Sequence, residues 1–478
     1  MKVYDKQYIG GKWVTGSSDI TLTNKNPLTG EVLYTYQSAD AKDVNAAYQA
    51  AREAQKEWKK FLPEQKQQVL ENALKKYLTM EEEINAVLLE EGGSTLAKRD
   101  FEYHTVASIF KLAMKFPDMM TGKIIPSNIP GKDNYIVRIP KGVITVIAPW
   151  NVPLVLAARS VIPAIAAGNG VVLKPASDTP ASAMLLAEAF EGSGIPDGLF
   201  NVVMGAGSRI GDAIVEHPVS DLISFTGSTE VGHHIGETAG RNLKEVSLEL
   251  GGNNAMIVTE DADLNAAAAA VIFGAFFHQG QVCMALNRII VMDSVYEEFT
   301  KILVEKVKAV KTGDPSDPEV FVGPIINESQ VEKIRRLLDE TIACGANVAL
   351  EGSFDGLLVT PWVLTEVTND MPAASEEVFG PVVCVLRAQS EEEAIAMAND
   401  TQYGLSGSVF CGDLYHGMEI AEQMETGMVH VNDQSINDEP QVMFGGVKNS
   451  GIGRFNDEWV LEKFTTDRWI SVQREKRF

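Results

Sequence analysis

The sequence predicts an α/β protein with buried parallel sheets, and three observations support this class. Between residues 143 and 258, short apolar stretches alternate with helical patterns, and a second alternating block follows residue 283. The chain has 478 residues, 45% of them hydrophobic, which is enough for about three domain-sized units. Strands that alternate with helices imply βαβ units with right-handed crossovers. Such sheets bind ligands at the carboxyl ends of their strands, so every loop after a strand is a candidate site.

The first 140 residues carry no obvious chemistry. Short β-like pieces with turn residues at 9–13 and 26–31 begin the chain. Apolar residues at three- and four-residue spacing then predict helices at 41–60, 64–78, 81–91 and 96–115. Residues 121–140 are punctuated by prolines and a glycine, which predicts an extended arm or hairpin.

Strands and helices alternate through the rest of the chain. The first block predicts strands at 143–148, 171–174, 199–203, 222–225, 245–250 and 254–258. Helices are expected up to 167 and at 180–191, 208–216, 229–239 and 264–278. The second block predicts strands at 287–292, 381–387, 407–410 and 427–431, and helices at 295–310, 328–344, 391–399 and 415–424. The tail, 463–472, reads as a strand that pairs outside its own domain.

Composition excludes several classes of function. The net charge is −24 and no basic stripe is visible, so nucleic acid is not an expected partner. Four widely spaced cysteines without a C-x-x-C pattern argue against a disulfide framework and a zinc site, and no metal is expected. We find no signal-peptide pattern and no apolar run long enough for a bilayer. A cytoplasmic protein without membrane contact is therefore the expectation.

The stretch Phe276–Ala285 contains the best candidate nucleophile. Cys283 follows a glycine break, Gly280, at the end of a long Ala-rich helix. This punctuation favours a thiol held at a surface or cleft. His278 could serve as its base, as in cysteine hydrolases, but it stands at a helix end without an orienting carboxylate. Packing or capping is the favoured interpretation of His278.

Loops after the predicted strands supply further candidates. Asn151 lies between prolines and could donate its amide N–H to an oxyanion, or it could begin an Asx-turn. Lys174 could hydrogen-bond a nucleotide sugar or be solvated. The turn from Gly227 through Ser228 to Gly232 suits a phosphate at a helix start, although an ordinary Ser/Thr cap is equally compatible.

Two carboxylates have contexts that favour function. Glu249 stands between two leucines and before a Gly-Gly pair, so partial burial would raise its pKa and suit it to general-base catalysis. Glu377 precedes Val-Phe-Gly-Pro and could reach a ribose. Alternatively, Glu249 could be a structural glutamate that is buried with a hydrogen-bond partner, and Glu377 could be an ordinary loop carboxylate.

Six motifs together resemble the aldehyde dehydrogenase family over nearly the whole chain. They are Pro149-Trp150-Asn151, Leu173-Lys174-Pro175, Phe225-Thr226-Gly227-Ser228-Thr229, Leu248-Glu249-Leu250-Gly251-Gly252, Gly280-Gln281-Val282-Cys283 and Glu377-Val378-Phe379-Gly380-Pro381. The glutamate and the cysteine stand 34 residues apart, the family's usual interval. The resemblance implies a small-molecule aldehyde as substrate and NAD or NADP as cofactor.

The resemblance also implies residue roles. Cys283 would attack the aldehyde, Asn151 and the Cys283 backbone N–H would hold the oxyanion, and Glu249 would activate the hydrolytic water. Lys174 would contact the adenosine ribose, Glu377 the nicotinamide ribose, Phe379 the nicotinamide and Ser228 the phosphate. The implied cofactor site also includes Trp150, Ser177, Gly227 and Gly232.

The family's architecture implies a Rossmann-type cofactor-binding domain at 1–115 and 142–248 and an α/β catalytic domain at 249–431. A small β oligomerisation arm at 116–141 and 457–478 would support a homodimer or homotetramer. Residues 432–456 would form a loop near the active site.

Within the family, the chain is similar to the aromatic group of benzaldehyde, vanillin and salicylaldehyde dehydrogenases. The likeness rests on residues 427–434, 437–440 and 444–451, and on Arg159, which stands eight residues after Asn151. Arg159 could face a ring substituent, and a structural role is the alternative. Many NAD-using relatives carry a glutamate where this chain has Ser177, so we expect NADP to be accepted as well.

Two other functions stay open. A CoA-acylating aldehyde dehydrogenase would resolve the thioester with CoA, but relatives of that kind usually lack the glutamate at the position of Glu249. A catalytically silent member would have no reason to retain Asn151, Glu249 and Cys283 together. A cysteine hydrolase is a more distant alternative, because Cys283 lacks a histidine partner.

Overall fold

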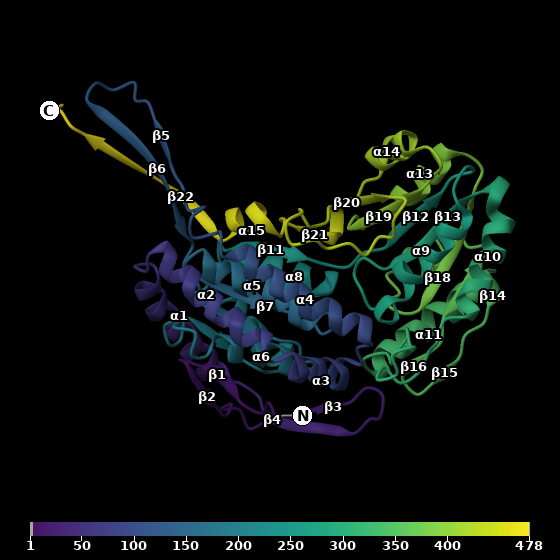
Figure 1. Ribbon diagram of the computed structural model, residues 1–478, viewed down its shortest axis with the longest axis horizontal. Coiled ribbons are helices and arrows are strands. Elements are labelled where there is room, and N and C mark those ends of the chain that lie inside the picture. The colour runs from purple at the N-terminus through teal and green to yellow at the C-terminus, as the bar shows by residue number, and fades with distance from the viewer. Residues whose placement is uncertain (1–2, 478) are drawn as a thin grey trace.

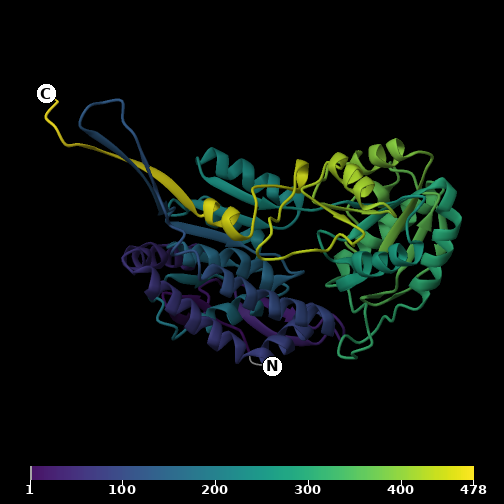
Figure 2. The ribbon, with the colours of Figure 1, turned by 45° about the horizontal axis from the view of Figure 1, so that its top comes forward.

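A computed structural model describes residues 3–477 and contains two large sheets, each covered by helices, and a projecting arm (Figure 1). Strands that precede residue 250, joined by residues 451–452, build one sheet, and strands between residues 254 and 431 build the other. Figure 2 shows the same two halves from a tilted direction, with the arm pointing away from both. The prediction of an α/β fold is confirmed.

The first sheet has eight strands. Their order is β2 (Lys12–Val14), β1 (Gln7–Ile9), β9 (Phe200–Val202), β8 (Gly170–Lys174), β7 (Val143–Ile147), β10 (Leu222–Thr226), β11 (Glu245–Glu249) and β21 (Gly451–Ile452). The five strands from β9 to β11 are parallel to one another, while the outer strands pair antiparallel. The loops after β7, β8 and β10 therefore leave the same edge of the sheet.

Helices cover both faces of this sheet. They are α1 (Ala41–Trp58), α2 (Pro63–Leu78), α3 (Glu81–Gly92), α4 (Leu96–Ala113), α5 (Pro153–Ala166), α6 (Ala181–Phe190), α7 (Gly207–Val215) and α8 (Thr229–Arg241). Every residue of α5 is buried, because this apolar helix packs against the sheet on one side and against α4 on the other. The largest hydrophobic core lies around it.

The second sheet has seven strands. Their order is β14 (Asn347–Leu350), β17 (Trp362–Thr365), β18 (Val382–Ala388), β13 (Leu286–Met292), β12 (Asn254–Val258), β19 (Ser406–Phe410) and β20 (Met428–Val431). Its helices are α9 (Leu264–Phe276), α10 (Tyr296–Lys308), α11 (Glu328–Ala343), α12 (Pro372–Ser375), α13 (Glu391–Asn399) and α14 (Leu414–Gln423). Short 3-10 turns occupy η1 (Phe277–Gly280), η2 (Asp293–Val295) and η3 (Lys448–Ser450).

The arm is a three-stranded antiparallel sheet. Strand β6 (Lys132–Pro140) lies between β5 (Lys123–Ile125) and the C-terminal strand β22 (Thr465–Gln473). The tail therefore pairs with a segment more than 300 residues earlier in the chain. Helix α15 (Asp457–Lys463), at the base of the arm, packs against α5.

Three details differ from the sequence expectations. The helix expected at 264–278 ends at Phe276, because His278 and Gln279 adopt left-handed backbone angles. Lys463 closes α15 and does not begin the tail strand. Strands β14 and β17, with the hairpin of β15 (Phe354–Asp355) and β16 (Leu358–Val359), fall between 345 and 380, where the sequence showed no pattern.

The N-terminal segment also forms a hairpin, β3 (Thr21–Lys25) and β4 (Val32–Gln37), around the turn expected at 26–31. Within residues 3–477, no helix is both long and apolar enough to cross a membrane.

Candidate active site

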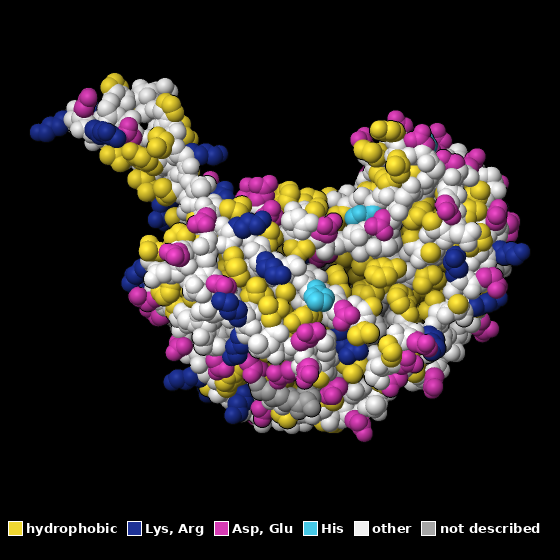
Figure 3. Space-filling model, in the orientation of Figure 1, with side chains coloured by type: hydrophobic (Ala, Val, Ile, Leu, Met, Phe, Trp, Pro, Cys, Tyr) yellow, Lys and Arg dark blue, Asp and Glu magenta, His cyan; other side chains and the backbone are white. Residues whose placement is uncertain are grey.

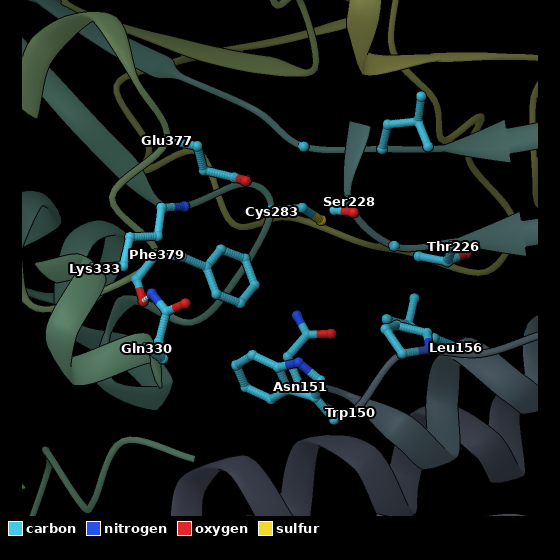
Figure 4. Close-up of a pocket in the computed structure, with 14 residues that line it drawn as sticks. Trp150, Asn151, Leu156, Thr226, Ser228, Cys283, Gln330, Lys333, Glu377 and Phe379 are labelled. Atoms are coloured by element: carbon cyan, nitrogen blue, oxygen red, sulfur yellow. Dashed lines mark hydrogen bonds between the residues drawn. The ribbon is translucent and has the colours of Figure 1, made fainter. Parts of the chain in front are cut away.

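A cavity of about 190 Å³ lies between the two sheet-bearing halves (Figure 4). One side comes from the loops after β7 and β10, and the other from residues of the second half. Its lining consists of Pro149, Trp150, Asn151, Leu156, Thr226, Gly227, Ser228, Leu250, Gly251, Cys283, Gln330, Lys333, Glu377 and Phe379. The Cys283 thiol lies near the centre of this view, with Glu377 and Phe379 to one side and Ser228 to the other.

A strained turn presents Cys283 to this cavity. After α9, the consecutive residues His278, Gln279 and Gly280 all have positive φ, and Gly280 has φ 72°. A Cβ at Gly280 would collide with the Gly380 carbonyl, so only glycine allows this exit from the helix. The glycine break predicted from the sequence therefore has a physical cause.

The backbone around Cys283 is fixed by residues that follow β11. Asn254 donates its side-chain amide to the carbonyls of Cys283 (2.9 Å) and Ala285 (2.8 Å). A Cβ at Gly252 would collide with the same Cys283 carbonyl. Gly252 thus allows the cysteine loop to pack directly against the end of the first sheet.

The thiol is held in its protonated form in this structure. Burial, followed by the negative charges of Glu377 and Glu249, raises the pKa of Cys283 to about 12. A thiolate is the reactive species, so the site needs a positive charge or a proton acceptor before Cys283 can attack. His278 does not fill that need: burial and the charge of Lys98 hold its pKa well below the ordinary value.

Asn151 lies directly beside the cysteine loop. Its Nδ2 donates to the Gln281 carbonyl at 2.9 Å, and the side chain is buried at the edge of the cavity. An amide nitrogen carries two N–H groups, and this bond uses one of them. The second has no other partner within residues 3–477, so it can serve an oxygen that develops negative charge near Cys283.

Glu249 is a fully buried carboxylate at the end of β11. Neither carboxylate oxygen has a hydrogen-bond partner within residues 3–477. Burial raises the pKa of Glu249 to about 8, and the positive charges of Arg159 and Arg454 limit the rise. A carboxylate that is about half ionised near pH 8 can take a proton from water.

A second set of side chains surrounds the opposite part of the cavity. The rings of Trp150 and Phe379 meet edge to face, with centroids 5.5 Å apart. Phe379 has a left-handed backbone (φ 56°), and Gln330 holds it by donating to its carbonyl at 2.9 Å. Glu377 accepts from the Gly252 N–H at 2.9 Å.

Lys174 ends β8 almost fully buried. Burial lowers its pKa to about 8, and the charge of Asp178 opposes this shift. Its only hydrogen bond within the described chain is to the Pro175 carbonyl, at 3.1 Å. Two ammonium donors therefore remain for a ligand with hydroxyl or phosphate oxygens.

Ser177 is partly exposed just beyond Lys174. The neighbouring carboxylate, Asp178, lines a separate cavity with Glu91 and Asn327. The position beside Lys174 is thus occupied by a neutral hydroxyl.

The glycine turn after β10 leads directly into α8. Ser228 caps this helix by accepting from the Val231 N–H at 3.4 Å. A Cβ on Gly232 would overlap the Leu250 side chain, so the helix start can approach the sheet closely only with glycine there. The resulting helix N-terminus, with its positive end, borders the cavity through Gly227 and Ser228.

Arg159 does not line the main cavity. Its guanidinium is buried over the rings of Phe444 (4.0 Å) and Phe455 (5.0 Å) and lies 3.6 Å from the Asp438 carboxylate. It thereby connects α5 to the loop of residues 432–456. A Cβ on Gly445 of this loop would stand 3.1 Å from Glu249 Oε1, so the loop closes over that carboxylate.

The profile of the "Aldehyde dehydrogenase family" matches residues 13–470 of this chain. The chain belongs to the aldehyde dehydrogenase family. The family and the enzyme class expected from the motifs are confirmed.

Aromatic aldehyde dehydrogenases are among its relatives. A benzaldehyde dehydrogenase of Bacillus subtilis is 49% identical over 99% of this chain and 98% of its own. A vanillin dehydrogenase of Corynebacterium glutamicum is 48% identical over 98% of both chains. The crystal structure of an NAD-dependent benzaldehyde dehydrogenase from Corynebacterium glutamicum has a TM-score of 0.91 at 44% identity, covering 98% of this chain and 97% of that one.

The structure of this aldehyde dehydrogenase brings most of the predicted site residues together. Trp150, Asn151, Gly227, Ser228, Cys283, Glu377 and Phe379 all line the main cavity. Sequence reasoning missed Gln330 and Lys333, which reach the cavity from α11. On an amphipathic helix these two polar residues look like any solvated face, so no local pattern could have identified them.

Proposed function

We propose that this aldehyde dehydrogenase oxidises an aromatic aldehyde to the carboxylic acid, with reduction of NAD or NADP. The observation that carries the proposal is the position of Cys283 and Asn151 in one cavity, with the buried, unpartnered Glu249 carboxylate acting electrostatically on the thiol. This set supplies a nucleophile, an oxyanion donor and a base.

The residues in and around the cavity fit a nicotinamide dinucleotide. Lys174 has free donors, the N-terminus of α8 offers a positive end, and the Trp150–Phe379 edge provides an apolar wall. When bound, the oxidised cofactor supplies a hydride acceptor and a positive charge. Lys174 would hold the adenosine ribose, Ser228 the phosphate and Glu377 the nicotinamide ribose.

The first half-reaction forms a bond between Cys283 Sγ and the aldehyde carbon. A cationic ligand in the cavity would offset the fields of Glu377 and Glu249, so that the thiol could release its proton to water. The free N–H of Asn151 and the Cys283 backbone N–H then stabilise the oxyanion. Transfer of the aldehydic hydrogen as hydride removes two electrons and leaves a thioester on Cys283.

The second half-reaction hydrolyses this thioester. Glu249 accepts a proton from water, and the hydroxide adds to the acyl carbon. The carbon–sulfur bond breaks, the acid leaves and Cys283 returns as a thiolate. The enclosed position of Glu249 beneath the 432–456 loop keeps its pKa near neutrality, as a general base requires.

An aromatic substrate agrees with the relatives and with the apolar surroundings of the site. Arg159 lies outside the main cavity, and we assign it to holding the 432–456 loop in place through Phe444, Phe455 and Asp438. The first sheet would form the cofactor-binding domain and the second the catalytic domain.

The arm would mediate assembly into a homodimer or homotetramer. Large apolar side chains stand exposed on it, and Figure 3 shows hydrophobic side chains along this projection. They are Ile124, Ile125, Trp469, Ile470 and Val472. Because Cys283 must stay reduced to react, we place the enzyme in the cytoplasm.

A screen for NAD(P)H formation tests the proposed function. Benzaldehyde, vanillin and salicylaldehyde should be turned over with higher kcat/KM than aliphatic aldehydes, and the product should be the free acid without CoA. The Cys283→Ala variant should form no NAD(P)H. Turnover by that variant, or a strict requirement for CoA, would contradict the proposal.

A further inference from the structure

Helix α5 begins without a cap of its own, directly after the oxyanion candidate Asn151. Its N-cap residue is Val152, which has no side-chain acceptor, and Pro153 follows at the first helical position. The N–H groups of Leu154 and Val155 are therefore the first donors without a partner in the helix. In most helices a Ser, Thr, Asp or Asn at the N-cap would accept them.

Glu102 of α4 takes over this capping. Its Oε2 accepts from Leu154 N at 2.9 Å and from Val155 N at 3.2 Å, across 52 and 53 residues of sequence. The carboxylate is fully buried and faces the positive end of α5, a favourable placement for negative charge. The cap comes from another helix, so α4 determines where α5 starts.

Lys98 keeps this carboxylate in place. Its Nζ lies 2.6 Å from Glu102 Oε1 and donates to Ser94 Oγ at 2.9 Å. Both members of the pair have zero exposure. A buried charge without its partner is strongly unfavourable, so the two residues depend on each other.

The same end of α4 also supports the cysteine loop. Phe101 packs edge to face on Phe277, with ring centroids 6.1 Å apart. Gln279 donates to the carbonyl of Gly93, which precedes α4 (3.5 Å), and to that of Pro324 in the second half of the chain (2.9 Å). Asn151 joins the two supported segments by its bond to the Gln281 carbonyl.

We propose that Glu102, held by Lys98, is the positioning residue that sets the Asn151 amide against the cysteine loop for oxyanion stabilisation. It touches neither substrate nor cofactor and acts through α5. The inference rests on the proposed function, because it needs Asn151 as the oxyanion donor. Oxyanion stabilisation requires donors placed to a fraction of an ångström, so loss of this cap should slow the chemistry.

Paired substitutions test the proposal without leaving a buried charge. K98M/E102L removes the charges and the acceptor, whereas K98M/E102Q removes the charges but keeps an acceptor oxygen. The K75M/E71L variant is the control, because this i,i+4 pair on α2 is solvent-exposed. The rate of NAD(P)H formation is measured in a single turnover and divided by the number of reactive Cys283 thiols. The KM for the cofactor is measured separately in the steady state.

We expect K98M/E102L to lower this rate about 10- to 100-fold with unchanged cofactor KM. K98M/E102Q should recover most of the rate, and K75M/E71L should equal the wild type. Asn151→Ala should lose about 100- to 1,000-fold, and adding K98M/E102L to it should cause no further loss.

The positioning role of Glu102 would be wrong if K98M/E102L kept the wild-type rate. It would also be wrong if K98M/E102L lowered the rate by the same factor with and without Asn151→Ala. Neither result would affect the proposed function. A wild-type rate in Asn151→Ala itself would overturn the proposed oxyanion donor. If K98M/E102L does not fold, K98M/E102Q is measured with and without Asn151→Ala. A small loss of rate that disappears in the Asn151→Ala background supports the proposal. A loss of the same size in both backgrounds refutes it.

Discussion

The ionisation of Glu249 predicts how the enzyme responds to pH. With a pKa of about 8, this side chain is a carboxylate in about one tenth of molecules at pH 7 and in about nine tenths at pH 9. The base is the ionised form, so hydrolysis of the thioester should accelerate about ten-fold as pH rises across this range. A normal glutamate, with its pKa near 4.5, would give a flat profile there.

Rapid mixing separates the two half-reactions. The initial burst of NAD(P)H reports hydride transfer, and the steady rate reports hydrolysis when hydrolysis limits turnover. Glu249→Gln should keep the burst, lose at least about 100-fold in the steady rate and lose the pH dependence of hydrolysis. Glu245→Gln, which changes an exposed carboxylate on the same strand, is the control. A steady rate in Glu249→Gln that still rises ten-fold from pH 7 to 9 would refute the assignment.

Three further predictions follow from contacts at the cavity and the arm. Gly252→Ala should push the Cys283 carbonyl away, destabilise the fold by about 1–3 kcal/mol in thermal unfolding and lower kcat. The control is Gly240→Ala, in open space on α8, which should not destabilise the fold. Ser177→Glu should reduce kcat/KM with NADP at least about ten-fold relative to NAD, since a carboxylate repels a 2′-phosphate; equal ratios in variant and wild type would reject the role of Ser177. Trp469→Asp, on the exposed arm, should lower the oligomeric mass in sedimentation without lowering the unfolding temperature of the protomer; an unchanged mass would exclude this arm surface from assembly.

Local sequence patterns predicted most strands of the two large sheets and the glycine break before Cys283. Buried strands such as Val143–Ile147 read as short apolar runs, and Gly280 marked the end of α9. The sequence patterns did not predict β14 to β17, because strands of two to four residues are too short to show an alternation of apolar and polar residues. His278 and Gln279 shortened α9 because tertiary contacts impose left-handed angles that a sequence window does not reveal.

Contacts between segments distant in the sequence limit how much of the site can be predicted from local patterns. Glu102 looked like an ordinary helical glutamate, since its capping of α5 depends on how α4 packs. Arg159 was placed in the substrate pocket by likeness alone, and its stacking on Phe444 and Phe455 became visible only with the loop in three dimensions. Residue type and spacing predict which groups are chemically able to act, and packing decides which of them meet.

Mass spectrometry of the acylated enzyme tests covalent catalysis by Cys283 most directly. Glu249→Gln, mixed with benzaldehyde and cofactor and quenched in acid, should carry one benzoyl group on the peptide that contains Cys283. The other cysteines, Cys344, Cys384 and Cys411, provide internal controls in the same digest. A benzoyl group at Cys283 is the predicted result; NAD(P)H formation without any adduct, or with the adduct on another cysteine, would contradict it.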